Sequence, residues 1–218
     1  MLLVAAAARN LTSALAGMAS GAWASSAGRD LHGKTLAVIG CGGIGRSVAR
    51  IAALGYGMRV VGCTRPDAPA PASLDHFARV TNDFAVAVRD ADFVSLHMPA
   101  SHDNVRFINT TRLACLSARA WLINTARGAV VDEAALFEAL AAGRIAGAAL
   151  DVFEREPYAA RDGSDFRTLS NVILTPHVGS NTVESNRRMA ERALQNIQFA
   201  DAGELQRMDL LNADVLAS

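Results

Sequence analysis

The fold is decided by the stretch TLAVIGCGGIG, residues 35–45. Its first five residues are an apolar run that predicts a buried parallel strand, and apolar residues at helical spacing follow over residues 44–54. Between them, Gly40, Gly42 and Gly45 form the pattern GxGxxG. The pattern is weak on its own, because a glycine-rich turn also occurs in chains that bind nothing. Its place between a predicted strand and a predicted helix favours dinucleotide binding.

Each glycine of this loop has a distinct role in that interpretation. Gly40 permits the tight turn, Gly42 lets the backbone approach a pyrophosphate, and Gly45 allows the helix to pack closely on the strand. The helix that begins there offers free N–H groups and partial positive charge, which suit phosphate oxygens. We therefore expect a dinucleotide cofactor at residues 40–45.

Strand and helix patterns alternate along the rest of the chain. Further strands are predicted at residues 58–63, 92–96, 120–124, 145–152 and 171–175. Helices are predicted at residues 2–19, 82–89, 132–142 and 181–200. This alternation predicts an α/β fold with a doubly wound parallel sheet, similar to a Rossmann domain.

Composition limits the classes of function. The chain has 218 residues, of which 51% are hydrophobic, and this supports a large buried core. Lys and Arg total 21, as do Asp and Glu, so no charge excess favours nucleic acid or an acidic membrane surface. The absence of a run of roughly 18 apolar residues argues against a membrane span. The three cysteines form no CxxC pair, which argues against a metal site and a disulfide framework and favours a cytoplasmic location.

The end of the second predicted strand bears on which cofactor is preferred. An aspartate or glutamate there accepts hydrogen bonds from the adenine ribose and selects NAD. The sequence at that point is GCTRP, residues 62–66, which has no carboxylate. Thr64 and Arg65 instead suit a 2′-phosphate, and we therefore favour NADP over NAD. Asp67 lies slightly further along and would restore NAD if the loop folds back.

Three residues that suit substrate binding and proton transfer each follow a predicted strand. Arg127 lies in NTARG, Glu156 in DVFEREP and His177 in TPHVG. Open α/β sheets place their active sites where strands end. A histidine coupled to a carboxylate exchanges a proton near neutral pH, and an arginine holds a carboxylate substrate through paired hydrogen bonds.

Each of the three also has a purely structural interpretation. Arg127 alone suits a strand-end cap or a surface ion pair, Glu156 suits a solvated charged loop, and His177 suits a turn after proline. Their order behind a dinucleotide loop favours catalysis for the set. Reduction of a 2-oxo acid places negative charge on the carbonyl oxygen, and a guanidinium and an imidazolium oppose that charge where it develops.

Five segments of the chain carry a family resemblance. They are residues 33–36 (GKTL) leading into the glycine loop, 96–99 (LHMP), 122–128 (LINTARG), 149–157 (ALDVFEREP) and 175–182 (TPHVGSNT). In their order and spacing the chain resembles the D-isomer-specific 2-hydroxyacid dehydrogenases, the family of phosphoglycerate dehydrogenase and glyoxylate/hydroxypyruvate reductase. The resemblance implies hydride transfer between NAD(P)H and a small 2-oxo or 2-hydroxy acid, such as glyoxylate or hydroxypyruvate.

The resemblance also implies roles for individual residues. Arg127 would bind the substrate carboxylate and carbonyl, His177 would donate a proton to the carbonyl oxygen, and Glu156 would stabilise the charged form of His177. Cofactor contacts are further implied for Gly43, Ile44, His97, Pro99, Thr125, Ala126, Asp151 and Gly179, as well as for Arg127 and His177. One departure is Gly43, which stands where many family members have arginine.

The same resemblance divides the chain into three parts. Residues 1–31 are an interdomain and dimerisation helix with its linker, residues 32–180 are the dinucleotide-binding domain, and residues 181–218 are a C-terminal helix and tail that would pack on a substrate domain. Met1 falls inside the interdomain helix, so we expect an N-terminally truncated chain that lacks most of the substrate domain. The first helix and Trp23 lie where the family forms its homodimer.

Two alternatives compete with this interpretation. A non-catalytic NAD(P)-binding module, either a dimerising fragment or a regulator, is consistent with the expected lack of a substrate domain. Formate dehydrogenase is a structural relative that pairs its histidine with a glutamine, and Glu156 argues against it.

Overall fold

The chain forms two compact units. The computed structural model describes residues 1–23, 25–65, 75–160 and 163–210. Met1–Pro176 belong to the first unit and His177–Ser218 to the second. The division at residues 31 and 180, which is a division by role, stays a prediction.

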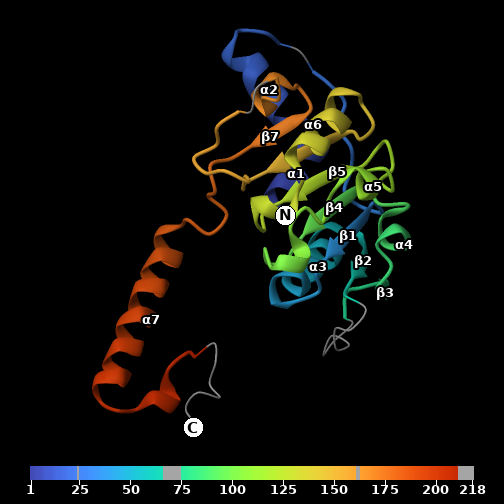
Figure 1. Cartoon of the computed structure of the whole chain (residues 1–218). Coiled ribbons are helices and arrows are strands. Elements are labelled where there is room, and N and C mark those ends of the chain that lie inside the picture. The colour runs from blue at the N-terminus through green and yellow to red at the C-terminus, as the bar shows by residue number, and fades with distance from the viewer. Residues whose placement is uncertain (24, 66–74, 161–162, 211–218) are drawn as a thin grey trace. The chain divides into compact units, whose positions relative to one another are not determined.

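A parallel seven-stranded sheet lies at the centre of the first unit (Figure 1). Its strands stand in the order β3-β2-β1-β4-β5-β6-β7, so the chain winds outward from β1 in one direction and from β4 in the other. This is the predicted doubly wound α/β fold, which is confirmed. The strands of the described residues are β1 (Thr35–Ile39), β2 (Arg59–Cys63), β3 (Arg79–Thr81), β4 (Phe93–Leu96), β5 (Trp121–Asn124), β6 (Gly147–Leu150) and β7 (Val172–Leu174).

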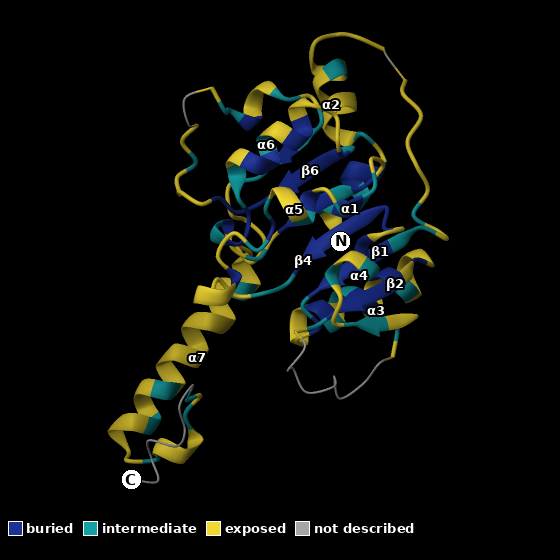
Figure 2. Ribbon diagram, turned by 45° about the vertical axis from the view of Figure 1, so that its right-hand side comes forward, coloured by how far each residue is buried: buried dark blue, intermediate teal, exposed yellow. Residues whose placement is uncertain are grey.

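Helices pack on both faces of the sheet. Residues of α1 and α3 bury one face together with Val38 and Phe93, whereas residues of α4, α5 and α6 bury the other with Ile39 and Leu96. Figure 2 shows the central strands as a buried layer, which explains why their sequences are mostly apolar without alternation. The α-helices are α1 (Leu2–Ala8), α2 (Leu11–Ala19), α3 (Gly43–Tyr56), α4 (Phe84–Val88), α5 (Thr110–Leu113), α6 (Glu133–Ala141) and α7 (Val183–Asp201). Short 3-10 helices are η1 (His102–Asn104), η2 (Gly128–Val130), η3 (Phe166–Thr168) and η4 (Leu205–Arg207).

The single helix predicted over residues 2–19 is two helices in the structure. α1 ends before Arg9, Asn10 adopts a left-handed conformation with φ 50°, and the two helices are bent by 69°. α1 buries Val4 and three alanines against the sheet, while α2 has no buried residue. The break keeps the charged Arg9 exposed at the edge of the core. By length and composition no single helix in the described ranges suffices to span a membrane, although α1 and α2 counted as one bent pair do.

One strand and one α-helix of the described residues have no counterpart in the sequence prediction. β3 has three residues and pairs with β2 at the edge of the sheet, and α5 has four residues. Both are shorter than the windows over which hydrophobic periodicity reveals an element. Neither changes the order of the central strands.

Candidate active site at the carboxyl edge of the sheet

Most of the predicted cofactor residues lie along one edge of the sheet. The strand register aligns Cys63, Ile39, Leu96, Asn124 and Leu150 in one row across β2, β1, β4, β5 and β6. The residues that directly follow this row are Thr64, Gly40, His97, Thr125 and Asp151. Because all the strands are parallel, this is the carboxyl edge, where open α/β sheets bind their ligands.

The glycine loop lies where the winding direction reverses. β1 has β2 on one side and β4 on the other, so the loop after β1 opens at the switch point of the sheet. α3 follows with Gly42 as its N-cap and Gly43 as its first residue. This strand–loop–helix order is the context that the GxGxxG pattern requires.

Two glycines of the loop are required by packing. Gly40 has φ +99°, and a Cβ added there would lie 2.3 Å from the His97 carbonyl oxygen. A Cβ on Gly45 would lie 2.1 Å from the Gly40 carbonyl oxygen. These contacts confirm that the first glycine makes the turn and the third allows helix and strand to pack closely.

The other two glycines face open space. A Cβ added at Gly42 or Gly43 meets no atom within 4 Å, and both residues are exposed, as is Ile44. Packing inside the chain therefore does not require glycine at these positions. A bare backbone at a helix N-terminus fits the pyrophosphate of a dinucleotide, which needs close approach to N–H groups.

The end of β2 places Thr64 and Arg65 beside the loop. The Thr64 N–H donates to the Thr81 carbonyl at 2.9 Å, which fixes the backbone there, and Arg65 is exposed. Cys41 and Cys63 are both buried next to each other, with the Cys41 Sγ 3.8 Å from the Cys63 carbonyl oxygen. Burial raises the pKa of Cys63 to about 11, so this thiol stays neutral. Asp67, the alternative NAD determinant, lies outside the described residues.

His97 is a half-buried, neutral member of this edge. Its Nε2 lies 2.9 Å from the Ser95 hydroxyl, and its backbone N–H donates to the Ile39 carbonyl at 2.7 Å. Burial lowers the pKa of His97 from 6.5 to about 4, and the amino-terminal charge adds to this effect. His97 therefore suits a neutral wall of the cofactor site better than a proton donor at neutral pH.

We expect His97 to make the protein less stable in mild acid. Its folded pKa lies below its unfolded pKa, so between pH 6.5 and about 4 the unfolded chain binds a proton that the folded chain does not. The free energy of unfolding should therefore fall by about 2 kcal/mol from pH 6.5 to pH 4.5 on account of this residue. Urea titrations at the two pH values measure the change. A His97→Gln variant should lose less stability over the same interval, and an equal loss would contradict the assignment.

Arg127 lies on a loop that Asn124 holds together. Asn124 is buried, its Nδ2 donates to the Arg127 carbonyl at 3.0 Å, and its Oδ1 accepts from the Ala126 N–H at 3.0 Å. The Arg127 side chain is exposed, as is Thr125, and its Nη1 donates to the Ala126 carbonyl at 2.6 Å. Asn124 is a positioning residue that the sequence prediction missed. The only signal for it is an asparagine at the end of an apolar strand.

Removal of the Asn124 side chain should cost substantial stability. Asn124→Ala leaves the part-buried Ala126 N–H and the Arg127 carbonyl without their partner, so we expect the free energy of unfolding to fall by about 2 kcal/mol. Urea titration measures this loss. Asn82→Ala serves as the control, because Asn82 is exposed and its replacement should change stability by less than about 0.5 kcal/mol. Equal stability of the two variants would contradict the role of Asn124.

The loop that carries Glu156 packs directly on the Arg127 loop. A Cβ added at Gly128 would lie 1.8 Å from the Phe153 carbonyl carbon, so the two backbones touch. Glu156 Oε1 accepts from the Phe153 N–H at 3.0 Å, and the Glu156 side chain is exposed. The structure thus brings the segments that bear Arg127 and Glu156 together at one edge.

Two further polar pairs shape this edge. Asp151 is buried, and its Oδ1 accepts from the Thr175 hydroxyl at 2.5 Å. Asn104 is also buried, and its Nδ2 donates to the Pro99 carbonyl at 2.9 Å, which fixes the loop after β4. Thr175 and Asn104 were not among the predicted site residues, since neither has a pattern that distinguishes it from an ordinary loop residue.

His177 is the first residue of the second unit. Its backbone has φ 53°, in the left-handed region that non-glycine residues rarely adopt, although histidine does so more often than most. Backbone strain of this kind concentrates at functional sites. His177 and Gly179 remain predicted site residues, and the pairing of His177 with Glu156 remains a prediction.

The sequence of the chain matches the model of a known protein family. The model is described as "D-isomer specific 2-hydroxyacid dehydrogenase, NAD binding domain", and it matches residues 1–179. The matched range includes the glycine loop, Arg127, Glu156 and His177. The chain belongs to the D-isomer specific 2-hydroxyacid dehydrogenases. The resemblance seen in the five sequence segments is thereby confirmed.

A relative named for its activity is similar to nearly the whole chain. A glyoxylate reductase of Thermococcus litoralis is 39% identical over 225 residues, which cover 99% of the chain. The chain spans 66% of the length of that relative.

Two solved structures that are similar to the chain share its fold and differ in the cofactor they contain. A D-lactate dehydrogenase of Aquifex aeolicus, complexed with NAD and lactic acid, matches 94% of the chain with a TM-score of 0.83 and 28% identity; the match covers 65% of that structure. A D-isomer specific 2-hydroxyacid dehydrogenase of Xanthobacter autotrophicus, in complex with NADPH and MES, matches 96% of the chain with a TM-score of 0.76 and 32% identity; that match covers 82% of the structure. Both nicotinamide cofactors therefore occur on this fold.

Proposed function

We propose that the chain binds NAD(P)H and takes part in hydride transfer to a small 2-oxo acid, or from the matching 2-hydroxy acid. The observation that carries the proposal is the position of two features on one edge of the sheet. A glycine loop with an open backbone at Gly42 and Gly43 lies at the switch point, and the Arg127 and Glu156 loops pack together further along the same edge. Glyoxylate and hydroxypyruvate are the substrates we favour.

The proposed roles follow from the charge that develops in the reaction. The nicotinamide, when bound, supplies or accepts the hydride. Arg127 binds the substrate carboxylate and opposes the negative charge on the carbonyl oxygen. His177 donates the proton to that oxygen, and Glu156 holds His177 and stabilises its charged form.

Two measurements test this function on the chain itself. Isothermal titration should show binding of NADPH or NADH, and an absorbance assay should show oxidation of the cofactor in the presence of glyoxylate or hydroxypyruvate. Failure of both cofactors to bind at millimolar concentration would reject the proposal at its first step.

A second candidate is cofactor binding without turnover. Arg127 and Glu156 are both exposed, whereas hydride transfer and the charges it develops are favoured by exclusion of water. The turnover assay separates the two candidates, because measurable reduction of either substrate by this chain excludes a pure binding module.

We further propose that NADP is preferred over NAD. Arg65 is exposed beside Thr64 at the end of β2, where a 2′-phosphate would lie, and a guanidinium pairs with phosphate through two hydrogen bonds. Arg65→Ala should weaken NADPH binding about tenfold and leave NADH binding unchanged. Arg59→Ala, at the opposite end of β2, is the matched control. Isothermal titration of the three proteins measures both affinities, and equal losses for NADH and NADPH would remove the preference.

A homodimer that uses the N-terminal region is also proposed. α2 has no buried residue, and Trp23 is 89% exposed. Apolar residues left in water favour association with a second copy. Light scattering at micromolar concentration should give the mass of a dimer, and a monomer would contradict this. The cytoplasmic location stays part of the proposal, and the three cysteines, all free thiols, favour it.

A further inference from the structure

The segment that carries Glu156 is fixed on both sides by aromatic residues. On its N-terminal side, the Glu156 carboxylate accepts from the N–H of Phe153, whose side chain is buried. On its C-terminal side lies Tyr158, whose ring centroid is 4.6 Å from that of Phe153. The contact between the two rings therefore holds residues 153–158 in one turn, and Glu156 is part of that turn.

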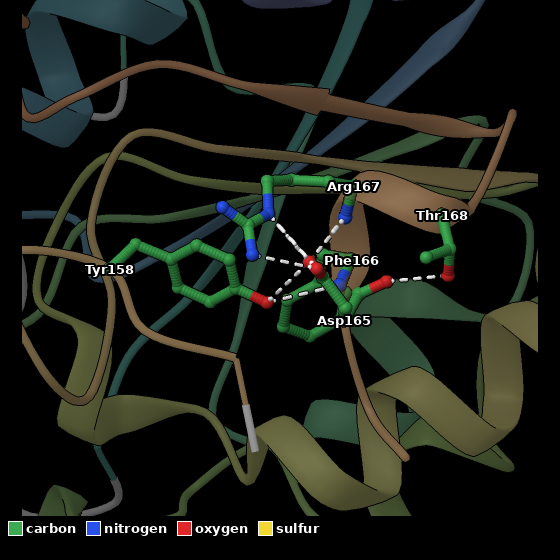
Figure 3. Close-up of polar contacts among 5 residues, drawn as sticks. All are labelled: Tyr158, Asp165, Phe166, Arg167 and Thr168. Carbon is green, nitrogen blue, oxygen red and sulfur yellow. Dashed lines mark hydrogen bonds and ion pairs between the residues drawn. The ribbon is translucent and has the colours of Figure 1, made fainter. Parts of the chain in front are cut away.

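Tyr158 ties this turn to η3 through its hydroxyl (Figure 3). The hydroxyl oxygen accepts from the Phe166 N–H at 3.0 Å, and it lies 3.5 Å from Asp165 Oδ1. Phe166 is buried, so its N–H has little access to water if the hydroxyl is removed. The Phe166 ring in turn packs on Phe137 of α6, with 5.9 Å between centroids.

Arg167 holds the other partner of the hydroxyl in place. Its Nε lies 2.9 Å from Asp165 Oδ1, and its Nη2 lies 2.7 Å from Oδ2, a paired geometry that leaves the carboxylate one orientation. The guanidinium carbon is 5.6 Å from the centroid of the Tyr158 ring. Tyr158 is thus the link between a fixed η3 turn and the segment that carries Glu156.

We propose that Tyr158 is a positioning residue for Glu156, through its hydroxyl bond to the Phe166 N–H and its ring contact with Phe153. This inference rests on the proposed function, in which Glu156 acts on His177. Tyr158 touches neither substrate nor cofactor in this role. It restricts the directions that the Glu156 carboxylate can take, and so the fraction of molecules in which that carboxylate is ready to hold a histidine.

The first readout compares three variants of the whole chain, and a fourth, Glu156→Gln, enters the second readout. Tyr158→Phe removes the hydroxyl and keeps the ring, Glu156→Ala removes the carboxylate that accepts from Phe153, and Thr168→Val removes a different hydroxyl of the same turn. The Thr168 hydroxyl donates to the Asp165 carbonyl at 2.7 Å and does not contact Tyr158, which makes it the matched control.

The first readout is hydrogen exchange at the Phe153 amide, which requires no bound cofactor. We expect exchange to be about tenfold faster in Tyr158→Phe and in Glu156→Ala than in the unmodified chain, and unchanged in Thr168→Val. The Leu122 amide in β5 reports global opening in the same samples and should stay constant. Unchanged exchange at Phe153 in Tyr158→Phe overturns the inference.

The second readout is the pH profile of glyoxylate reduction. A general loss of packing would lower the rate by the same factor at every pH and would leave the midpoints of the profile unchanged. Tyr158→Phe should move the profile in the same direction as Glu156→Gln, by a smaller amount. Where Glu156→Gln moves the midpoints of the profile, a Tyr158→Phe profile that keeps its midpoints also overturns the inference. If Glu156→Gln has no effect on the profile while Tyr158→Phe accelerates exchange at Phe153, Tyr158 still positions the carboxylate and the proposed pair of Glu156 with His177 fails.

Discussion

Replacement of Arg127 by lysine is expected to lower kcat/KM for reduction of glyoxylate by about 10²–10³-fold. Lysine keeps the positive charge but loses the planar pair of donors that holds a carboxylate and a carbonyl oxygen together. The decrease in kcat/KM should therefore contain both the loss of substrate orientation and the loss of charge stabilisation. Steady-state rates followed by nicotinamide absorbance measure the effect, and NADPH affinity by titration should change far less than kcat/KM.

Arg144→Lys provides the control for this experiment. Arg144 is exposed, and its guanidinium lies 4.0 Å from Glu138 of α6 in a surface pair. Exposed pairs of this kind contribute little, so its replacement should leave kcat/KM unchanged within about twofold. Equal rates for the two variants would remove Arg127 from the proposed substrate site, whatever the cofactor affinity shows.

The central fold can be predicted from the sequence because burial on both faces leaves a plain signal. β1, β4 and β5 are mostly apolar and are buried without alternation, and glycines or polar residues follow each of them. Parallel strands between two layers of helices produce this pattern, whereas half-exposed strands do not. The break at Asn10 carried no such signal, since alanine-rich residues on both sides of it favour helix. It is set by the fit of α1 to the sheet, which is a tertiary effect.

The residues of the candidate site also fall into those that the sequence can predict and those that it cannot. Residues whose type suits the chemistry, such as Arg127 and Glu156, can be singled out by motif and order. Residues that hold them cannot, because their role depends on contacts between distant segments. Gly128 is the clearest case: the motif alone assigns it no role, but in the structure it is the point where the Arg127 loop touches the Phe153 backbone.

The glycine loop allows stability and cofactor binding to be separated by two substitutions. Gly40→Ala should lower the free energy of unfolding by about 3 kcal/mol, because it places a Cβ 2.3 Å from the His97 carbonyl oxygen at φ +99°. Gly42→Ala should change stability by less than about 0.5 kcal/mol, since φ is −72° and its Cβ meets no atom within 4 Å. Urea titration measures both values, and comparable losses would contradict the packing difference between the two glycines.

Gly42→Ala, which should leave stability unchanged, should weaken cofactor binding. The Gly42→Ala methyl group occupies the open space that a pyrophosphate needs when it approaches the N-terminus of α3, so NADPH affinity should fall at least about tenfold, or about 1.4 kcal/mol. Gly143→Ala is no suitable control, because φ there is +63°; Gly43→Ala has the same open surroundings and sits one residue further into the helix. We expect Gly43→Ala to bind NADPH more tightly than Gly42→Ala, since its methyl group lies one residue further into α3. A Gly42→Ala protein that folds and binds NADPH with unchanged affinity would show that the cofactor does not lie against this loop.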